Sequence, residues 1–326
     1  MDTLSIAGLF LVVSIALKAL RNIYKTFLRP AVNFKKLGKW AVITGATDGI
    51  GKAYALALAK KGMSIVLISR TESKLQAVQK EIEEKNYDGV EVKYVACDYS
   101  TFDDKKRFIV KAAISELDIG LLINNVGVSY KFPKYYDELT DEEVYSLMEM
   151  NVTSTTWMTK MVIGGMVERK RGSIVNIASA AGLYTMPLLA GYSASKGYIE
   201  KFSRGLNAEY KAKNITVQCQ APFYVATKLA KMRKSMSVPT PEEYVQRGMK
   251  WIGHSDPVAY PIMLHAIQGY ILDSLPASVV DKVVLNMHLG IRKAGLKKEA
   301  RLAKEASEKI PLNSAYDIRG ETYYIL

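Results

Sequence analysis

The sequence has few of the side chains that bind metals or cross-link a chain. Its 326 residues include two cysteines and three histidines. Cys97 and Cys219 stand in apolar runs without metal-binding or redox spacing, and the histidines are scattered near the C-terminus. We therefore expect no metal site and no disulfide framework, and we predict that both cysteines are reduced core residues.

The chain also lacks internal repeats and low-complexity linkers. With 49% hydrophobic residues, it is long enough for one large α/β core plus terminal additions. We expect three segments: a membrane anchor with a basic linker (1–36), a dinucleotide-binding catalytic domain (37–254) and a helical, membrane-proximal extension (255–326).

Positive charge is in excess, with a formal net charge of +13. A nucleic-acid-binding protein would combine basic residues with base-stacking aromatics on a recognisable module, and that pattern is not evident. The basic residues instead follow the first apolar segment and gather again over 292–304. Attraction to an anionic membrane surface explains this distribution, and a solvated basic surface is the alternative.

The N-terminal apolar segment covers 4–17 and continues past Lys18 to Leu20. A membrane span needs about 20 apolar residues, so this segment is marginal, with Lys18 able to reach the headgroups. Asp2 and the lack of a basic start disfavour a cleaved signal peptide. Because the basic residues follow the apolar run, we predict a membrane anchor that leaves the catalytic part in the cytosol; a buried N-terminal helix is the alternative.

From Trp40 onward, apolar runs alternate with stretches of helical periodicity. This pattern predicts an α/β fold with a doubly wound, Rossmann-like parallel sheet. The expected strands are 40–44, 64–69, 90–96, 120–124, 173–177 and 215–220.

A glycine-rich turn follows the first expected strand and opens a helix. Gly45 allows the tight turn, Gly49 lets the backbone approach a pyrophosphate, and Gly51 allows close helix packing. The context of strand, turn and helix indicates a dinucleotide site rather than a merely structural turn. Arg70, at the end of the second strand, favours the 2′-phosphate of NADPH; an ordinary exposed arginine is the alternative.

A second constellation combines a tyrosine and a lysine four residues apart with a serine at a strand end. Tyr192 and Lys196 would share one helical face, so that the ammonium favours ionisation of the phenol. Ser179 would hydrogen-bond a substrate oxygen. The pattern of tyrosine and lysine is weak alone, but together with Ser179 and the glycine-rich turn it predicts a carbonyl/alcohol oxidoreductase that uses the tyrosine for proton transfer.

These segments resemble the short-chain dehydrogenase/reductase family, and within it the microsomal very-long-chain 3-oxoacyl-CoA reductases and 17β-hydroxysteroid dehydrogenases. The resemblance covers roughly residues 40–298. Pro222 is followed by Phe223, as in the membrane-bound group, where many other members have glycine. The matching motifs are TGATDGIGKAYA (44–55), LLINNVGVSY (121–130), MNVTS (150–154), NIASAAG (176–182), YSASK (192–196) and PFYVATKLAKMRK (222–234).

The resemblance implies a role for each site residue. Asn151 would hold a water of the proton relay and Ser179 would position the carbonyl. Tyr192 would protonate the carbonyl, while Lys196 would bind the nicotinamide ribose and lower the pKa of the tyrosine. The implied cofactor contacts are Gly45, Thr47, Asp48, Gly49, Ile50, Gly51, Arg70, Asp98, Asn125, Gly127, Tyr192, Lys196, Val225 and Thr227.

The resemblance also implies an activity, the NADPH-dependent reduction of long-chain 3-oxoacyl-CoA in fatty-acid elongation at the endoplasmic-reticulum membrane. It admits other elongation enzymes as partners, and a homo-oligomer. A reductase of steroids or other lipophilic ketones is the main alternative, and a catalytically silent NADPH-binding scaffold is a weaker one. The basic residues Lys228, Lys231, Arg233 and Lys234 would attract the phosphates of CoA or simply line the exposed side of a lid. Segment 262–289 is expected to form an interfacial helical pair that borders the entry route of a lipid tail, or else ordinary core helices.

Overall fold

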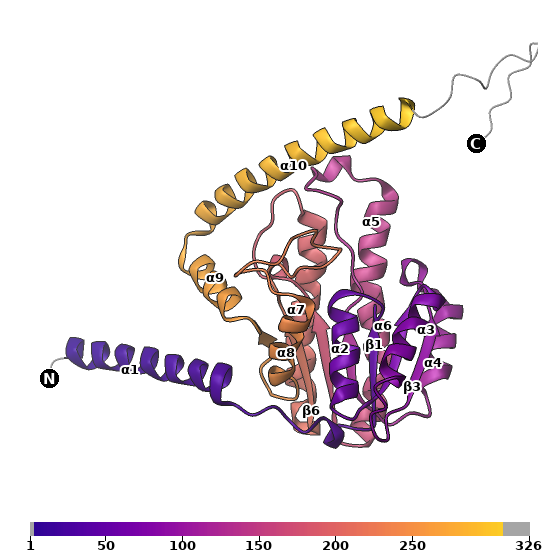
Figure 1. Cartoon of the computed structure of the whole chain (residues 1–326). Coiled ribbons are helices and arrows are strands. Elements are labelled where there is room, and N and C mark those ends of the chain that lie inside the picture. The colour runs from indigo at the N-terminus through magenta and orange to yellow at the C-terminus, as the bar shows by residue number, and fades with distance from the viewer. Residues whose placement is uncertain (1–2, 309–326) are drawn as a thin grey trace, which may run out of the picture.

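A computed structural model describes residues 3–308 and shows a parallel sheet with helices on both faces (Figure 1). The strand order is β3-β2-β1-β4-β5-β6-β7, and every neighbouring pair is parallel. The predicted doubly wound sheet is therefore confirmed. The strands are β1 (Trp40–Thr44), β2 (Ser64–Ser69), β3 (Val92–Ala96), β4 (Ile119–Asn124), β5 (Gly172–Ile177), β6 (Ile215–Gln220) and β7 (Val258–Ala259).

Helices precede, connect and follow these strands. The α-helices that the structure describes are α1 (Thr3–Ile23), α2 (Gly49–Lys60), α3 (Glu72–Glu83), α4 (Asp104–Ile114), α5 (Asp141–Leu147), α6 (Ser154–Glu168), α7 (Ala190–Tyr210), α8 (Pro241–Gly248), α9 (Met263–Ser274) and α10 (Ala277–Glu308). Two short π-helical segments also occur, at Tyr24–Leu28 and Met148–Thr153.

The sheet separates two apolar layers because successive residues of a strand point to opposite faces. In β1, Ala41 and Ile43 pack with residues of α2, α3 and α8, whereas Val42 packs with residues of α4 and α6. All of β1 is buried, as expected for a parallel strand covered on both faces. Cys97 and Cys219 are buried free thiols, as predicted.

Strand β7 was not predicted, although it completes the sheet beside β6. It contains only two residues and pairs Val258 with Cys219 and Ala259 with Gln220. So short a strand leaves no recognisable alternation in the sequence. It lies within 255–326, the segment expected to form a C-terminal extension.

Helix α1 projects from the α/β body rather than packing into it (Figure 1). Leu9, Phe10, Leu11 and Val12 are all largely exposed, so the alternative of a buried N-terminal helix is wrong. Within residues 3–308, no helix combines the length and the apolar character needed to cross a membrane.

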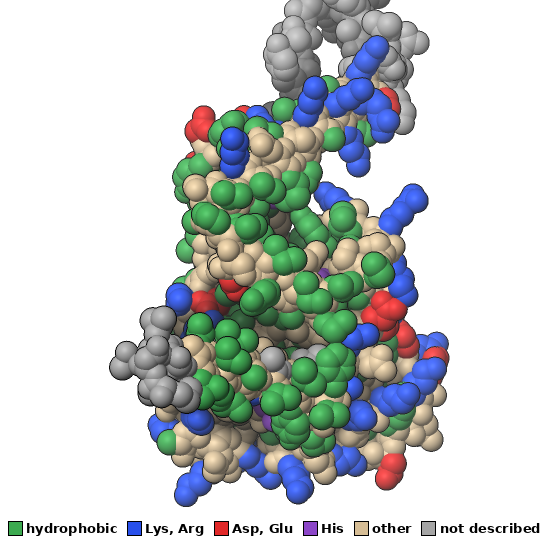
Figure 2. All heavy atoms as spheres, turned by 90° about the vertical axis from the view of Figure 1, so that its left-hand side faces the viewer, with side chains coloured by type: hydrophobic (Ala, Val, Ile, Leu, Met, Phe, Trp, Pro, Cys, Tyr) green, Lys and Arg blue, Asp and Glu red, His purple; other side chains and the backbone are tan. Residues whose placement is uncertain are grey.

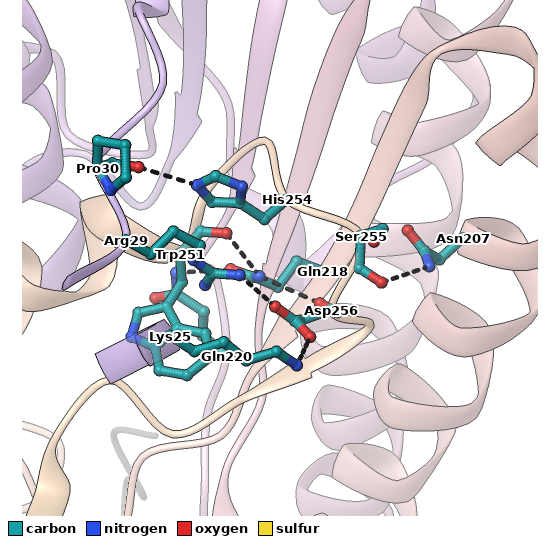
Figure 3. A network of polar contacts seen from close by, with 10 residues as sticks. All are labelled: Lys25, Arg29, Pro30, Asn207, Gln218, Gln220, Trp251, His254, Ser255 and Asp256. Atoms are coloured by element: carbon teal, nitrogen blue, oxygen red, sulfur yellow. Dashed lines mark hydrogen bonds and ion pairs between the residues drawn. The ribbon is translucent and has the colours of Figure 1, made fainter. Parts of the chain in front are cut away.

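The base of α1 is tied to the body by an ionic network (Figure 3). Asp256 accepts hydrogen bonds from Lys25 and Arg29, and the Arg29 guanidinium lies 4.8 Å from the centre of the Trp251 ring. Gln218 of β6 holds the same segment, because its side chain donates to the Trp251 and Asp256 carbonyls at 2.8 and 3.1 Å. The chain that leaves α1 is thus fixed to the sheet.

Helix α10 passes over the loops that follow β4 and β5 (Figure 1). His288 contacts the Pro187 carbonyl at 2.6 Å, and Arg292 forms an ion pair with Glu138. A Cβ atom added to Gly295 would lie 2.5 Å from the Phe132 ring, which marks close packing. The α9–α10 pair therefore borders the edge of the sheet at which parallel strands end.

Candidate active site

The predicted site residues gather at the carboxyl edge of the sheet, where α/β proteins of this topology bind ligands. The glycine-rich turn follows β1, Arg70 follows β2 and Asn125 follows β4. Ser179 lies two residues after β5, while Tyr192 and Lys196 lie in the first half of α7.

The glycine-rich turn has the backbone that the sequence predicts. Gly45 and Gly49 have φ angles of 63° and 53°, in the left-handed region that favours glycine. A Cβ atom at Gly51 would lie 2.3 Å from the Gly45 carbonyl oxygen, so the helix start packs directly on the turn. Asp48 caps α2 by accepting the Gly49 N–H at 2.8 Å, and Ile50 packs against the core. The result is a glycine backbone at a helix N-terminus, which suits a pyrophosphate.

Asn125 and Thr47 fix this turn to the neighbouring strands. The Asn125 amide donates to the Thr44 and Gly45 carbonyls at 3.2 and 3.3 Å, and the Thr44 hydroxyl accepts the Asn125 N–H at 3.0 Å. The Thr47 hydroxyl lies 3.0 Å from that of Ser69 on β2. Both predicted cofactor residues therefore shape the turn.

Arg70 and Asp98 stand beyond the ends of β2 and β3. The Arg70 side chain is exposed. Hydrogen bonds from Ser100 lower the pKa of the Asp98 carboxyl, and the positive charge of Arg70 contributes in the same direction. The two side chains therefore lie close enough to interact, with the guanidinium open to solvent.

Asn151 lies in the π-helical segment before α6 and is buried. Its side chain accepts the Val128 N–H at 2.7 Å and donates to the Val128 carbonyl at 3.0 Å and the Ser195 hydroxyl at 2.8 Å. A Cβ atom at Gly127 would lie 2.9 Å from the Asn151 side-chain oxygen and 3.0 Å from Lys196 Nζ. Asn151 thus joins the loop after β4 to α7; its part in a water relay stays a prediction.

Tyr192, Ser179 and Lys196 come together as expected from their spacing. Ser179 lies close enough to the Tyr192 phenol to affect its pKa. The Lys196 ammonium is buried, donates to the Ile177 carbonyl at 3.2 Å and lies 6.0 Å from the centre of the Tyr192 ring. The loop of Gly182 packs on the backbone of Lys196, where a Cβ atom would come within 2.4 Å.

The electrostatics of the pair differ from the prediction in one respect. Burial raises the pKa of Tyr192, while the nearby Ser179 side chain acts in the opposite direction. Burial also lowers the pKa of Lys196 to about 8. The expected lowering of the tyrosine pKa by Lys196 is not seen, because the ammonium is directed to the Ile177 carbonyl and desolvation of the phenol prevails. A protonated phenol at neutral pH is the form that can donate a proton.

The 221–240 loop, between β6 and α8, covers the glycine-rich turn. Val225 is buried, and the Thr227 methyl group would lie 3.3 Å from a Cβ atom at Gly49. Lys228 forms an ion pair with Asp48 at 2.5 Å. The predicted cofactor residues Val225 and Thr227 are thus next to the turn, and the exposed basic side chains Lys231 and Arg233 stand on the outer side.

Sequence reasoning missed Ser195 as a member of the site. It lies between Tyr192 and Lys196 in the sequence, is buried, and accepts a hydrogen bond from the Asn151 side chain. Its hydroxyl also donates to the Tyr192 carbonyl at 2.7 Å. The sequence gives no signal for this role, since the partner lies 44 residues away along the chain.

Comparisons with known proteins agree with this geometry. The family model described as short chain dehydrogenase matches residues 39–237. Very-long-chain 3-oxoacyl-CoA reductase-B of Danio rerio is 46% identical over 268 residues, covering 81% of this chain and 84% of that protein. Very-long-chain 3-oxoacyl-CoA reductase of Homo sapiens is 43% identical over 266 residues, covering 80% and 83%.

Solved structures share the same architecture. The structure of a short-chain dehydrogenase from Sphingobium yanoikuyae in complex with NADPH has a TM-score of 0.64 and 28% identity, covering 72% of this chain and 91% of that chain. A structure described for 7beta-hydroxysteroid dehydrogenase stereoselectivity has a TM-score of 0.70 and 23% identity, covering 78% and 99%. The second likeness concerns the fold alone.

Proposed function

Because this chain belongs to the short-chain dehydrogenase family, we propose that it reduces long-chain 3-oxoacyl-CoA to 3-hydroxyacyl-CoA with NADPH. The chain is an oxidoreductase, and the fold it shares with that family binds nicotinamide cofactors. The observation that supports this substrate is the sequence identity of 46% and 43% with two very-long-chain 3-oxoacyl-CoA reductases, over most of both chains. The complete set of Tyr192, Lys196 and Ser179 argues against a silent scaffold.

The residues present fit a nicotinamide dinucleotide, since Gly45 and Gly49 have φ angles of 63° and 53° and Gly49 begins α2, so that the backbone N–H groups of a helix N-terminus can meet a pyrophosphate. When bound, the cofactor supplies a hydride to the carbonyl carbon. The Tyr192 phenol donates its proton to the carbonyl oxygen, and the Ser179 hydroxyl orients that oxygen. The buried Lys196 ammonium, 6.0 Å from the centre of the Tyr192 ring, would bind the ribose of the nicotinamide nucleotide.

The preference for NADPH rests on Arg70, an exposed guanidinium at the end of β2. We expect Arg70→Asp to weaken NADPH binding by about 10- to 100-fold, the contribution of one charge-assisted hydrogen bond, and NADH binding much less. Fluorescence titration of both cofactors measures this. Lys105→Asp, an equal charge reversal on α4, is the control, and equal losses for both cofactors with Arg70→Asp would contradict the assignment.

Acyl-CoA and ketosteroid differ in charge, and the 221–240 loop offers a way to separate them. A CoA ester carries several phosphate charges, whereas a neutral steroid gains little from Lys231 and Arg233. We expect the pair Lys231→Gln and Arg233→Gln to raise KM for a long-chain 3-oxoacyl-CoA by about three- to tenfold at low salt, with a smaller effect at high salt.

Steady-state kinetics on both substrate types provide the test. A much higher kcat/KM for a ketosteroid, or an acyl-CoA KM that does not depend on the two basic side chains, would favour the steroid alternative.

We also propose that the protein associates with the endoplasmic-reticulum membrane, with its catalytic domain in the cytosol. Hydrophobic side chains gather on the face from which α1 projects (Figure 2). Phe10 on α1 and Tyr270 on α9 are both largely exposed. Basic residues follow α1 and occupy the second half of α10, where they would meet anionic headgroups. These features favour helices that insert their apolar side chains into one leaflet.

A matched pair of substitutions tests this association. Phe10 and Phe108 are 75% and 73% exposed, but Phe108 lies on α4. We expect Phe10→Asp to lower partitioning onto anionic vesicles in a flotation assay by about tenfold or more, since an aromatic ring that would insert into the lipid is replaced by a charge. Phe108→Asp should leave partitioning unchanged, and equal behaviour of the two variants would contradict the proposal.

A further inference from the structure

A histidine outside the predicted site holds both ends of the 221–240 loop. His265 lies in the first turn of α9 and is fully buried. Its Nδ1 atom accepts the Phe223 N–H at 3.3 Å, and its Nε2 atom lies 3.1 Å from the Ser237 carbonyl oxygen. Phe223 and Ser237 stand near opposite ends of the loop, so one imidazole ring bridges them.

These partners fix the form of the ring. A carbonyl oxygen only accepts hydrogen bonds, so Nε2 must carry a proton, and Nδ1 must be unprotonated to accept the Phe223 N–H. The neutral ring with its proton on Nε2 satisfies both contacts. Burial also lowers the pKa of His265, which favours this neutral form.

Aromatic packing strengthens the Phe223 end of this bridge. The Phe223 ring lies 5.6 Å from the imidazole and stacks at 6.2 Å on Tyr184 and 6.3 Å on Tyr260. The Tyr184 hydroxyl donates to the Gly269 carbonyl of α9 at 3.0 Å. Phe223 therefore connects the loop to α9 and to the chain that precedes α7.

Between its two held ends, the loop carries side chains that face the site. Thr227 lies against Gly49 of the glycine-rich turn. Tyr224 is near enough to the Tyr192 phenol to contribute to its raised pKa, although burial is the main cause. The position of these side chains depends on where the loop is attached.

We propose that His265 is a positioning residue, which holds the 221–240 loop against the active site through Phe223 and Ser237. It touches no reacting atom and acts through the loop. The consequence for acyl-CoA binding rests on the proposed function, whereas the consequence for loop position does not.

Three substitutions of His265 distinguish its hydrogen bond with Phe223 from its hydrogen bond with Ser237. His265→Phe keeps a ring and removes both hydrogen bonds. His265→Asn retains an acceptor near the place of Nδ1, and His265→Gln retains a donor near the place of Nε2. His254→Phe is the matched control, because His254 contacts Pro30 at the base of α1 and not the loop.

Limited trypsin digestion reports the loop directly, since cleavage needs local opening. We expect His265→Phe to speed cleavage after the loop residues Lys231 and Arg233 by about 10- to 100-fold, since it removes two hydrogen bonds that each contribute about three- to tenfold. Cleavage after Lys297 in α10 should keep its rate. The Asn and Gln variants should lie between His265→Phe and the unaltered protein.

Steady-state kinetics supply the second measurement. KM for a long-chain 3-oxoacyl-CoA should rise by about tenfold in His265→Phe, while kcat stays within about twofold because Tyr192 is untouched. Loop cleavage in His265→Phe at the same rate as in the unaltered protein would overturn the proposal. An equal increase in the rate of cleavage after Lys297 would also overturn it, because it would show general unfolding. Faster loop cleavage with an unchanged KM would also overturn it. An enzyme that turned over no acyl-CoA would refute the proposed function and leave the digestion result standing.

Discussion

Tyr192→Phe is expected to reduce carbonyl reduction by about a thousandfold while the protein still binds NADPH. The substitution removes the proton donor but keeps the ring, and general acid catalysis contributes about 10²- to 10⁴-fold. Since burial raises the pKa of Tyr192, the phenol is protonated and ready to donate at neutral pH. The dissociation constant for NADPH should change by less than about tenfold, the contribution of one neutral hydrogen bond.

Stopped-flow reduction and fluorescence titration measure these two quantities. Tyr198→Phe is the control on the same helix, where the hydroxyl contacts Thr156 at 2.8 Å, away from Ser179 and Lys196. Near-normal turnover by the Tyr192 variant would remove the tyrosine from the proton-transfer step, and loss of NADPH binding would show damage to the site as a whole.

Lys196→Met is expected to abolish activity and to stabilise the fold at neutral pH. The folded-state pKa of about 8 lies below the usual 10.5 of a lysine, because the ammonium is desolvated. Below pH ~8 the folded protein therefore carries a buried charge that reduces its stability, and this loss is recovered as pH rises toward the unfolded pKa. Methionine removes the charge, so the free energy of unfolding at pH 7 should increase by about 1–3 kcal/mol, after allowance for the lost bond to Ile177.

Urea unfolding at several pH values measures the stability difference. The difference in free energy of unfolding between the methionine variant and the unaltered protein should decrease as pH rises above about 8. It should approach zero near the pKa of Lys196 in the unfolded chain. In the unaltered enzyme, reduction should also decline above about pH 8, as Lys196 loses its proton. A methionine variant that is less stable than the unaltered protein at pH 7 would contradict the assignment of a buried, charged Lys196. An equal increase in the free energy of unfolding at every pH would contradict it too.

The local parts of the site could be predicted from the sequence. Gly45, Gly49 and Gly51 act through backbone conformation within one turn, and Tyr192 and Lys196 share a helical face because four residues separate them. The alternation of apolar and helical segments likewise predicted six of the strands, with ends displaced by at most two residues. In these cases the determining interactions lie between residues close along the chain.

The tertiary structure decided the features whose partners are distant in sequence. Strand β7 is too short to show a pattern and exists because β6 offers it an edge. Asp256 meets Lys25 across 231 residues, and His265 meets Phe223 across 42. The direction of the Tyr192 pKa also depended on folding, since spacing places Lys196 nearby but only packing directs its ammonium to the Ile177 carbonyl and desolvates the phenol.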